Sequence, residues 1–178
     1  MHEITNGCIE VLEQSEVFLQ SSTPESYTNI TKPYFISSCG EHMRHILDHF
    51  NAIKADFNSG TIDYDARQRG SDIETSIHCA QNSISEIKNW LRSLDSEHLN
   101  KALHIQTEVS VSEKHITRTP SCLGRELVFA STHAVHHYSM MSVAMQMQDL
   151  TADRNFGIAP ATQTYLETSR DKNNTCAP

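Results

Sequence analysis

The segment from Cys122 to Asp149 constrains the fold more than any other, because apolar residues occupy almost every side of it at helical spacing. Its apolar residues are Leu123, Leu127, Phe129, Ala130, Ala134, Met141 and Met145. A helix that is apolar nearly all round must be enclosed by other elements. We therefore predict one long, buried helix over these residues.

Three further segments repeat their apolar residues with the period of an amphipathic helix. These segments are Glu3–Gln20, Cys39–Asn58 and Ser71–Leu94. Ser38 and Ser71 are each followed three residues later by a glutamate, Glu41 or Glu74. This spacing is that of a capping box, so we place a helix N-terminus at each serine.

Before the last predicted helix the pattern changes to alternation. Residues from Ala102 to Thr119 alternate apolar and polar side chains around a polar stretch, which predicts a short β-hairpin. Asp63 to Gly70 is expected to be a polar loop. The predicted fold class is therefore all-α, a four-helix bundle with a small β-hairpin insertion before the last long helix. We expect a single domain over residues 1–168 and a disordered tail over residues 169–178.

Composition excludes several classes of partner. The net charge is −8, and no cluster of lysine and arginine stands out, which argues against binding to nucleic acid. No apolar run has the length of a membrane span, so we expect no membrane partner. The five cysteines are odd in number and widely spaced, without a Cys-x-x-Cys motif. They indicate reduced thiols and a cytoplasmic protein.

Histidine is the one residue type with an unusual distribution. The chain has 11 histidines, and two short segments hold His42, His45, His49, His133, His136 and His137. His133 and His137 lie four residues apart, so a helix places both imidazoles on one face, where they can bind a single metal ion. The third ligand would come from His42, His45 or His49, which spacing alone does not distinguish. The competing interpretation is that these are ordinary core or surface histidines.

Three imidazoles with an open fourth position are typical of a catalytic zinc site. We expect a divalent metal ion, zinc first, with nickel or iron as alternatives that nitrogen ligands also accept. Glu126 lies two helical turns before His133 and is a candidate general base, although a carboxylate at a helix start has an equally good electrostatic role. His49 is the second candidate base.

Two histidine motifs and one loop resemble the DinB family of bacterial proteins, which includes YfiT-like metal-dependent hydrolases and thiol transferases. The first motif runs from Ser38 to Phe50 and contains a histidine followed by two residues and an aspartate. The second is His133-Ala-Val-His-His137-Tyr, and the loop is Phe156-Gly-Ile-Ala-Pro-Ala-Thr. Many members have Arg-Gly-Gln after the last histidine, where this chain has Tyr138-Ser-Met.

The resemblance implies a four-helix bundle, often a homodimer, with a divalent metal held by His45, His133 and His137. It implies a metal-dependent hydrolase or thiol S-transferase that activates water or a thiolate for attack on a small-molecule substrate, in some members with a low-molecular-weight thiol as cofactor. The alternative is a non-catalytic metal-binding protein of a stress response, whose ion supports folding.

Overall fold

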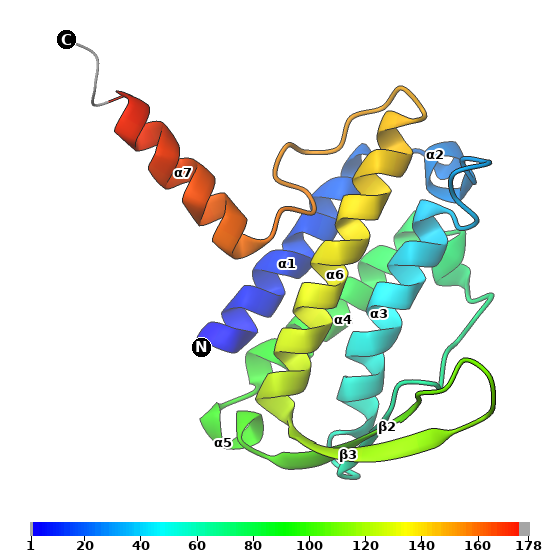
Figure 1. The fold of residues 1–178 in the computed structure, drawn as a ribbon, viewed down its shortest axis with the longest axis vertical. Helices are drawn as coiled ribbons and strands as arrows, with labels where there is room; N and C mark the ends of the chain where they lie inside the picture. The colour runs from blue at the N-terminus through cyan, green and yellow to red at the C-terminus, as the bar shows by residue number, and fades with distance from the viewer. Residues whose placement is uncertain (1, 175–178) are drawn as a thin grey trace.

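The protein combines helices with a β-sheet, as seen in a computed structural model that describes residues 2–174. Within that range the chain forms seven α-helices, one 3-10 helix and three strands (Figure 1). The helices are α1 (Glu3–Ser21), α2 (Pro24–Thr28), α3 (Cys39–Asp56), η1 (Asp72–Glu74), α4 (Ile77–Ser93), α5 (Ser96–Leu99), α6 (Leu123–Gln146) and α7 (Pro160–Asn174). The strands are β1 (Thr61–Asp63), β2 (Ala102–Glu108) and β3 (Ile116–Cys122).

The four long helices α1, α3, α4 and α6 pack side by side and enclose most of the core (Figure 1). Helix α3 packs against α6 and α4, and α1 packs against the other faces of α4 and α6. The long apolar segment predicted to be buried is α6, whose Leu127, Ala134 and Met141 are inaccessible to solvent. This packing determines which face of α6 lies against α3.

The three strands form a mixed sheet at the end of the molecule where α3 ends and α6 begins (Figure 1). Strands β2 and β3 are antiparallel, with Ile105 opposite Thr119, and β1 adds to the other edge of β2 in parallel, with Ile62 beside Ile105. Ile62 is fully buried, which anchors this edge to the core. Pro120 is tolerated in β3 because β3 is an edge strand.

The predicted all-α fold class, a four-helix bundle with a hairpin insertion, is wrong. The hairpin strands exist, but β1 joins them in parallel, and the class is α/β. The sequence signal for β1 is weak because only three residues, Thr61 to Asp63, take part in pairing. Its stability comes from the distant strand β2 rather than from local alternation.

The predicted start of the third long helix is also wrong. Ser71 makes no side-chain capping bond, and only the short helix η1 follows it, whereas α4 begins after Ser76, whose side chain accepts from the Cys79 N–H. The Glu74 carboxylate instead accepts hydrogen bonds from the Arg44 guanidinium and the Gly70 N–H. The capping box at Ser38, by contrast, is confirmed, with the Ser38 side chain accepting from the Glu41 N–H.

The C-terminal part continues away from the helical core as α7 (Figure 1). Helix α7 runs to Asn174, so the expected tail of residues 169–178 begins within it, and residues 175–178 lie outside those described. Before α7, Phe156 stacks on Phe18 and Tyr138 and fastens the connecting loop to α1 and α6.

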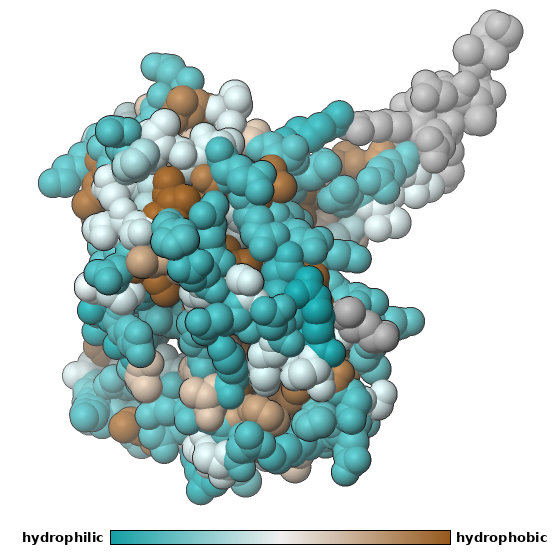
Figure 2. Space-filling model, turned by 180° about the vertical axis from the view of Figure 1, so that it is seen from behind, coloured by the Kyte–Doolittle hydropathy of each residue, from teal (hydrophilic) through white to brown (hydrophobic). Residues whose placement is uncertain are grey.

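Polar side chains dominate the face opposite that of Figure 1, where hydrophobic atoms form small separate areas (Figure 2). None of the helices within residues 2–174 has both the length and the apolar character needed to cross a lipid bilayer.

Gly40 in the first turn of α3 provides a test of how closely η1 approaches that helix. A Cβ at this position would overlap the Glu74 carbonyl and crowd the Tyr27 ring. We expect Gly40→Ala to lower the free energy of unfolding by about 1–3 kcal/mol, the usual cost of overpacking, in urea denaturation.

Gly7→Ala is the matched control. Gly7 also lies in a helix, but a Cβ there has no neighbour within 4 Å. Because alanine is the better helix former, this variant should gain about 0.5–1 kcal/mol. Equal stability losses in the two variants would contradict the packing of η1 on α3.

Candidate metal site

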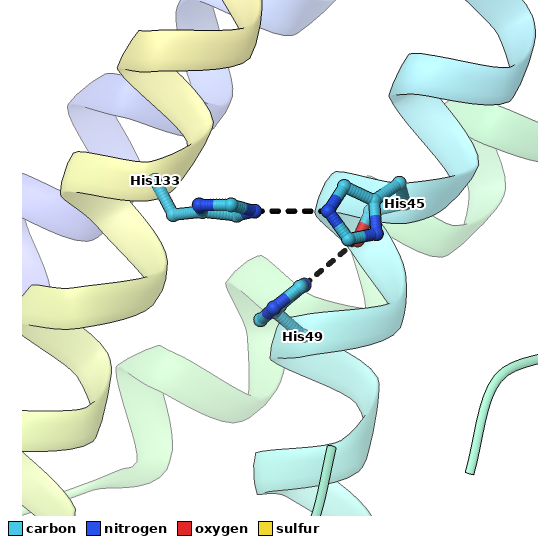
Figure 3. A group of neighbouring side chains, drawn as sticks. All are labelled: His45, His49 and His133. Atoms are coloured by element: carbon cyan, nitrogen blue, oxygen red, sulfur yellow. Dashed lines mark hydrogen bonds between the residues drawn. The ribbon is translucent and has the colours of Figure 1, made fainter. Parts of the chain in front are cut away.

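Two helices bring four histidine side chains together. Helix α3 contributes His45 and His49, and α6 contributes His133 and His137, each pair four residues apart and therefore on one helix face. Figure 3 shows His133 pointing across the gap between the helices toward His45 and His49. We refer to these four residues as the histidine cluster.

The ring nitrogens of the cluster approach one another closely. His133 Nε2 lies 2.9 Å from His45 Nε2 and 3.1 Å from His137 Nε2. Potential ligand atoms of His45, His49 and His133 all lie within 4.8 Å of one another. The cluster therefore directs several nitrogens to one small volume.

Hydrogen bonding alone does not account for this convergence. Each ring nitrogen carries either one hydrogen or one lone pair, directed outward in the ring plane. The Nε2 of His133 faces two other Nε2 atoms, and a single hydrogen or lone pair cannot point along both directions. At most one of these contacts is a well-aligned hydrogen bond.

The spacing suits nitrogens that share one metal ion. With metal–nitrogen distances of about 2.0–2.1 Å, two imidazole nitrogens lie about 2.9 Å apart at a right angle and about 3.4 Å apart at a tetrahedral angle. The observed separations of 2.9 and 3.1 Å fall in this range. The residues present therefore fit a divalent metal.

The backbone fixes the tautomer of His49. Its Nδ1 lies 2.9 Å from the carbonyl oxygen of His45, and a carbonyl can only accept, so Nδ1 carries the hydrogen (Figure 3). The neutral ring then has its lone pair on Nε2, the nitrogen available to a metal. Metal-binding histidines are commonly oriented in this way through their second nitrogen.

A fifth histidine, His42, supports the cluster from the side. Its Nδ1 lies 2.9 Å from Nδ1 of His137, so one of the two nitrogens donates to the other. If His137 keeps the lone pair on Nε2, it is the donor, and the hydrogen of His42 is on Nε2. That nitrogen is buried without a partner among the described residues.

Burial keeps the imidazoles neutral. Desolvation is the main cause that lowers the pKa of His45 and of His137 to about 3, and nearby histidines lower both further. The pKa of His133 is lowered to about 4, again chiefly by burial. At neutral pH these side chains therefore present lone pairs, the form that metals bind.

Glu126 is fully buried and engaged by three donors. Its carboxylate accepts from the hydroxyls of Tyr64 and Ser121 and pairs with the Arg125 guanidinium. The ring of Tyr64 packs against His49 at 5.2 Å, so Tyr64 connects Glu126 to the cluster. A general base needs a carboxylate oxygen that is free to accept a proton, but both Glu126 oxygens already accept hydrogen bonds from these donors. The role of Glu126 as general base stays a prediction.

A pocket of about 410 Å³ opens beside His49. Its walls come from α3, from the segment after β1, from β2 and β3, and from the first turns of α6. Tyr64, Arg67, Arg125 and Phe129 line it together with His49. This size suits a small molecule.

The structure thus groups two of the predicted ligands, His45 and His133, with His49, and the third, His137, reaches this group through its Nε2, 3.1 Å from that of His133. The sequence predicted His49 as a candidate base and as one of three possible third ligands, and its spacing from His45 repeats that of His133 and His137. Tyr64 and Arg67 were not predicted for the site, because they lie in the segment expected to be a plain polar loop. His136 points outward and is exposed.

Comparison with known proteins gives one distant relative. Over 106 residues, or 60% of its length, the chain is 27% identical to FK506-binding protein 5 of Rhizopus delemar. The match spans 28% of that protein. No protein-family model and no solved structure matches the chain.

The low histidine pKa values predict how the metal-free protein responds to acid. The folded-state pKa values of about 3 and 4 lie below the ordinary value of 6.5, so the unfolded chain binds more protons between these limits. The free energy of unfolding should therefore fall as the pH falls from 6.5 toward 4. Thermal melting of chelator-treated protein at pH 7, 6 and 5 measures this.

Replacing a cluster histidine should remove part of this pH dependence. We expect a shallower decline in melting temperature for His45→Gln, while His115→Gln, at an exposed position between β2 and β3, should follow the wild type. A wild-type melting temperature that is constant from pH 7 to pH 5 would show that the cluster protonates normally in the folded state.

Proposed function

We propose that this protein is a metal-dependent enzyme of the DinB type, a hydrolase or thiol S-transferase, with a divalent metal held by the histidine cluster. His45, His133 and His137 are the ligands that the family resemblance implies, and His49 is a further candidate. Zinc is the first expectation, with nickel or iron as alternatives. The contact of one Nε2, that of His133, with two others carries the proposal.

When bound, such a metal supplies a Lewis acid that lowers the pKa of a coordinated water or thiol. The side chains prepare the site for it by remaining neutral and by directing their nitrogens to one point. His42 and the His45 carbonyl orient the rings of His137 and His49 through their second nitrogens. Preorganised ligands of this kind reduce the cost of ordering the site on binding.

The surroundings of the cluster favour an enzyme over a purely structural ion. Structural zinc sites are closed by four protein ligands, whereas a catalytic site keeps one side open to substrate. With His45, His133 and His137 as the only protein ligands, the fourth position would stay open, and a pocket borders the cluster at His49. We propose that a low-molecular-weight thiol reaches the cluster from the pocket side.

The proposed location is the cytoplasm. Cys8, Cys39, Cys79 and Cys122 are free thiols, in keeping with a reducing compartment.

Metal content is the direct test. Tag-free protein incubated separately with zinc, nickel and ferrous iron and then desalted should retain about one equivalent of metal per chain, measured by elemental mass spectrometry. His45→Ala, His133→Ala and His137→Ala should each lose it, because each removes one nitrogen from the shared point. His49→Ala then decides whether a fourth imidazole is needed.

His136→Ala is the matched control, since His136 is on the same helix but exposed. It should bind metal like the wild type. Circular dichroism of each variant without metal separates loss of the site from loss of the fold. Retention of metal by all three ligand variants, or no metal in the wild type, would overturn the proposed site.

Turnover separates the enzyme from a non-catalytic metal protein. Metal-loaded wild type should consume members of an ester panel or of an electrophile panel with added thiols, and His133→Ala should not. Full metal occupancy that raises the melting temperature without any turnover would favour the non-catalytic alternative. The Rhizopus relative is named for binding FK506, so a direct titration of this chain with FK506 tests whether it shares that ligand.

A further inference from the structure

The pocket beside His49 contains a cation that the protein leaves without an acidic partner. Arg67 lies in the segment after β1 and is exposed at the pocket. Its Nε donates to the Tyr64 carbonyl at 3.4 Å, and within residues 2–174 no ion pair involves this guanidinium.

A second arginine, Arg125, also lines the pocket, from the first turn of α6. Arg125 pairs with Glu126 at 2.8 Å and stacks over Phe129 at 5.3 Å from the ring centre. This pair fixes the guanidinium in place and offsets the only carboxylate that lines the pocket. The positive charge of Arg67 is therefore not cancelled within the pocket.

Asp65, two residues before Arg67, makes its side-chain hydrogen bonds to strand β2 and no ion pair with that arginine. Asp65 accepts from the Thr107 hydroxyl and from the Glu108 N–H, which ties it to strand β2. Arg67 and His49 line the same pocket, so the guanidinium and the histidine cluster border one cavity. A negative group near Arg67 would therefore lie on the pocket side of the histidine cluster.

The remaining pocket wall is partly apolar. Phe129 from α6, Ile105 from β2 and Pro120 from β3 line it. Small-molecule sites commonly combine an apolar wall with a few polar groups that fix orientation. Arginine binds carboxylates and phosphates through paired N–H groups, which gives it this orienting role.

We infer that this pocket binds a small anionic substrate, with a carboxylate or phosphate at Arg67, an apolar part against Phe129, and its reacting end toward the histidine cluster. The inference deepens the proposed function and rests on it for the identity of the reacting end. Binding of the anion itself requires only Arg67 and the pocket walls. The two can therefore be tested separately.

The test is isothermal titration calorimetry of the metal-free protein with three probes that share a phenyl ring. The probes are benzoate, phenyl phosphate and the neutral benzyl alcohol. Wild type should bind at least one anion, and the better of the two identifies carboxylate or phosphate as the recognised group. Benzyl alcohol should bind at least about tenfold more weakly, since it lacks the charge that Arg67 contacts.

Arg67→Gln should weaken anion binding by about tenfold. Arg69→Gln is the matched control, because Arg69 is exposed two residues away and does not line the pocket. It removes the same charge and should bind like the wild type. Both substitutions are at exposed positions, so both variants should fold, and thermal melting checks this.

Several results would overturn the inference. They are equal binding of benzyl alcohol and the anions, equal losses in Arg67→Gln and Arg69→Gln, or no binding of any probe. Arg67→Gln should keep its metal while losing affinity for the anion, so metal content and anion binding together distinguish the two proposals. If the wild type binds the anion but retains no metal, the anion pocket stands and the proposed metal enzyme is overturned. If it retains metal but binds no anion, the metal site stands and the anion pocket is overturned.

Discussion

The packing of α3 against α6 is the interaction on which the site depends. Apolar residues such as Phe50 on α3 and Leu127 on α6 are fully buried and fix the rotation of the two helices. Because side chains four residues apart share a helix face, the same rotation brings two histidines from each helix together. Burying these polar rings costs free energy, and the burial of the surrounding apolar side chains offsets that cost.

The sheet contributes the second half of the site. Strand β1 pairs with β2 and brings the following segment, with Tyr64 and Arg67, next to His49. Tyr64 then donates to the buried carboxylate of Glu126 at the start of α6. Strand β1, which is missing from the predicted fold, thus places one wall of the pocket, the segment that carries Tyr64 and Arg67.

Much of the helical part of this protein could be predicted from its sequence. Helix α1, the start of α3 at the Ser38 capping box and the buried α6 follow from local periodicity and capping, which a sequence records directly. Strand β1 could not be predicted, because three residues carry no pattern of their own and depend on a partner strand far along the chain. The start of α4 was misplaced for a similar reason: Arg44, distant in sequence, takes the Glu74 carboxylate.

The candidate site shows the same division. Helical spacing placed His133 and His137 on one face, and family resemblance chose His45 from a stripe of three. Spacing could not show that His49 also faces the cluster, nor that His42 contacts His137, since both depend on the rotation of α3 against α6. Tyr64 and Arg67 depend on the sheet and left no trace in local sequence.

X-ray absorption spectroscopy of the zinc-loaded protein tests the central claim most directly. The account predicts three or four nitrogen neighbours at about 2.0–2.1 Å, with the outer-shell scattering of imidazole rings. A shell of oxygens without imidazole scattering, or sulfur neighbours at about 2.3 Å, would show that the metal binds elsewhere. The convergence of these histidines would then be a feature of packing alone.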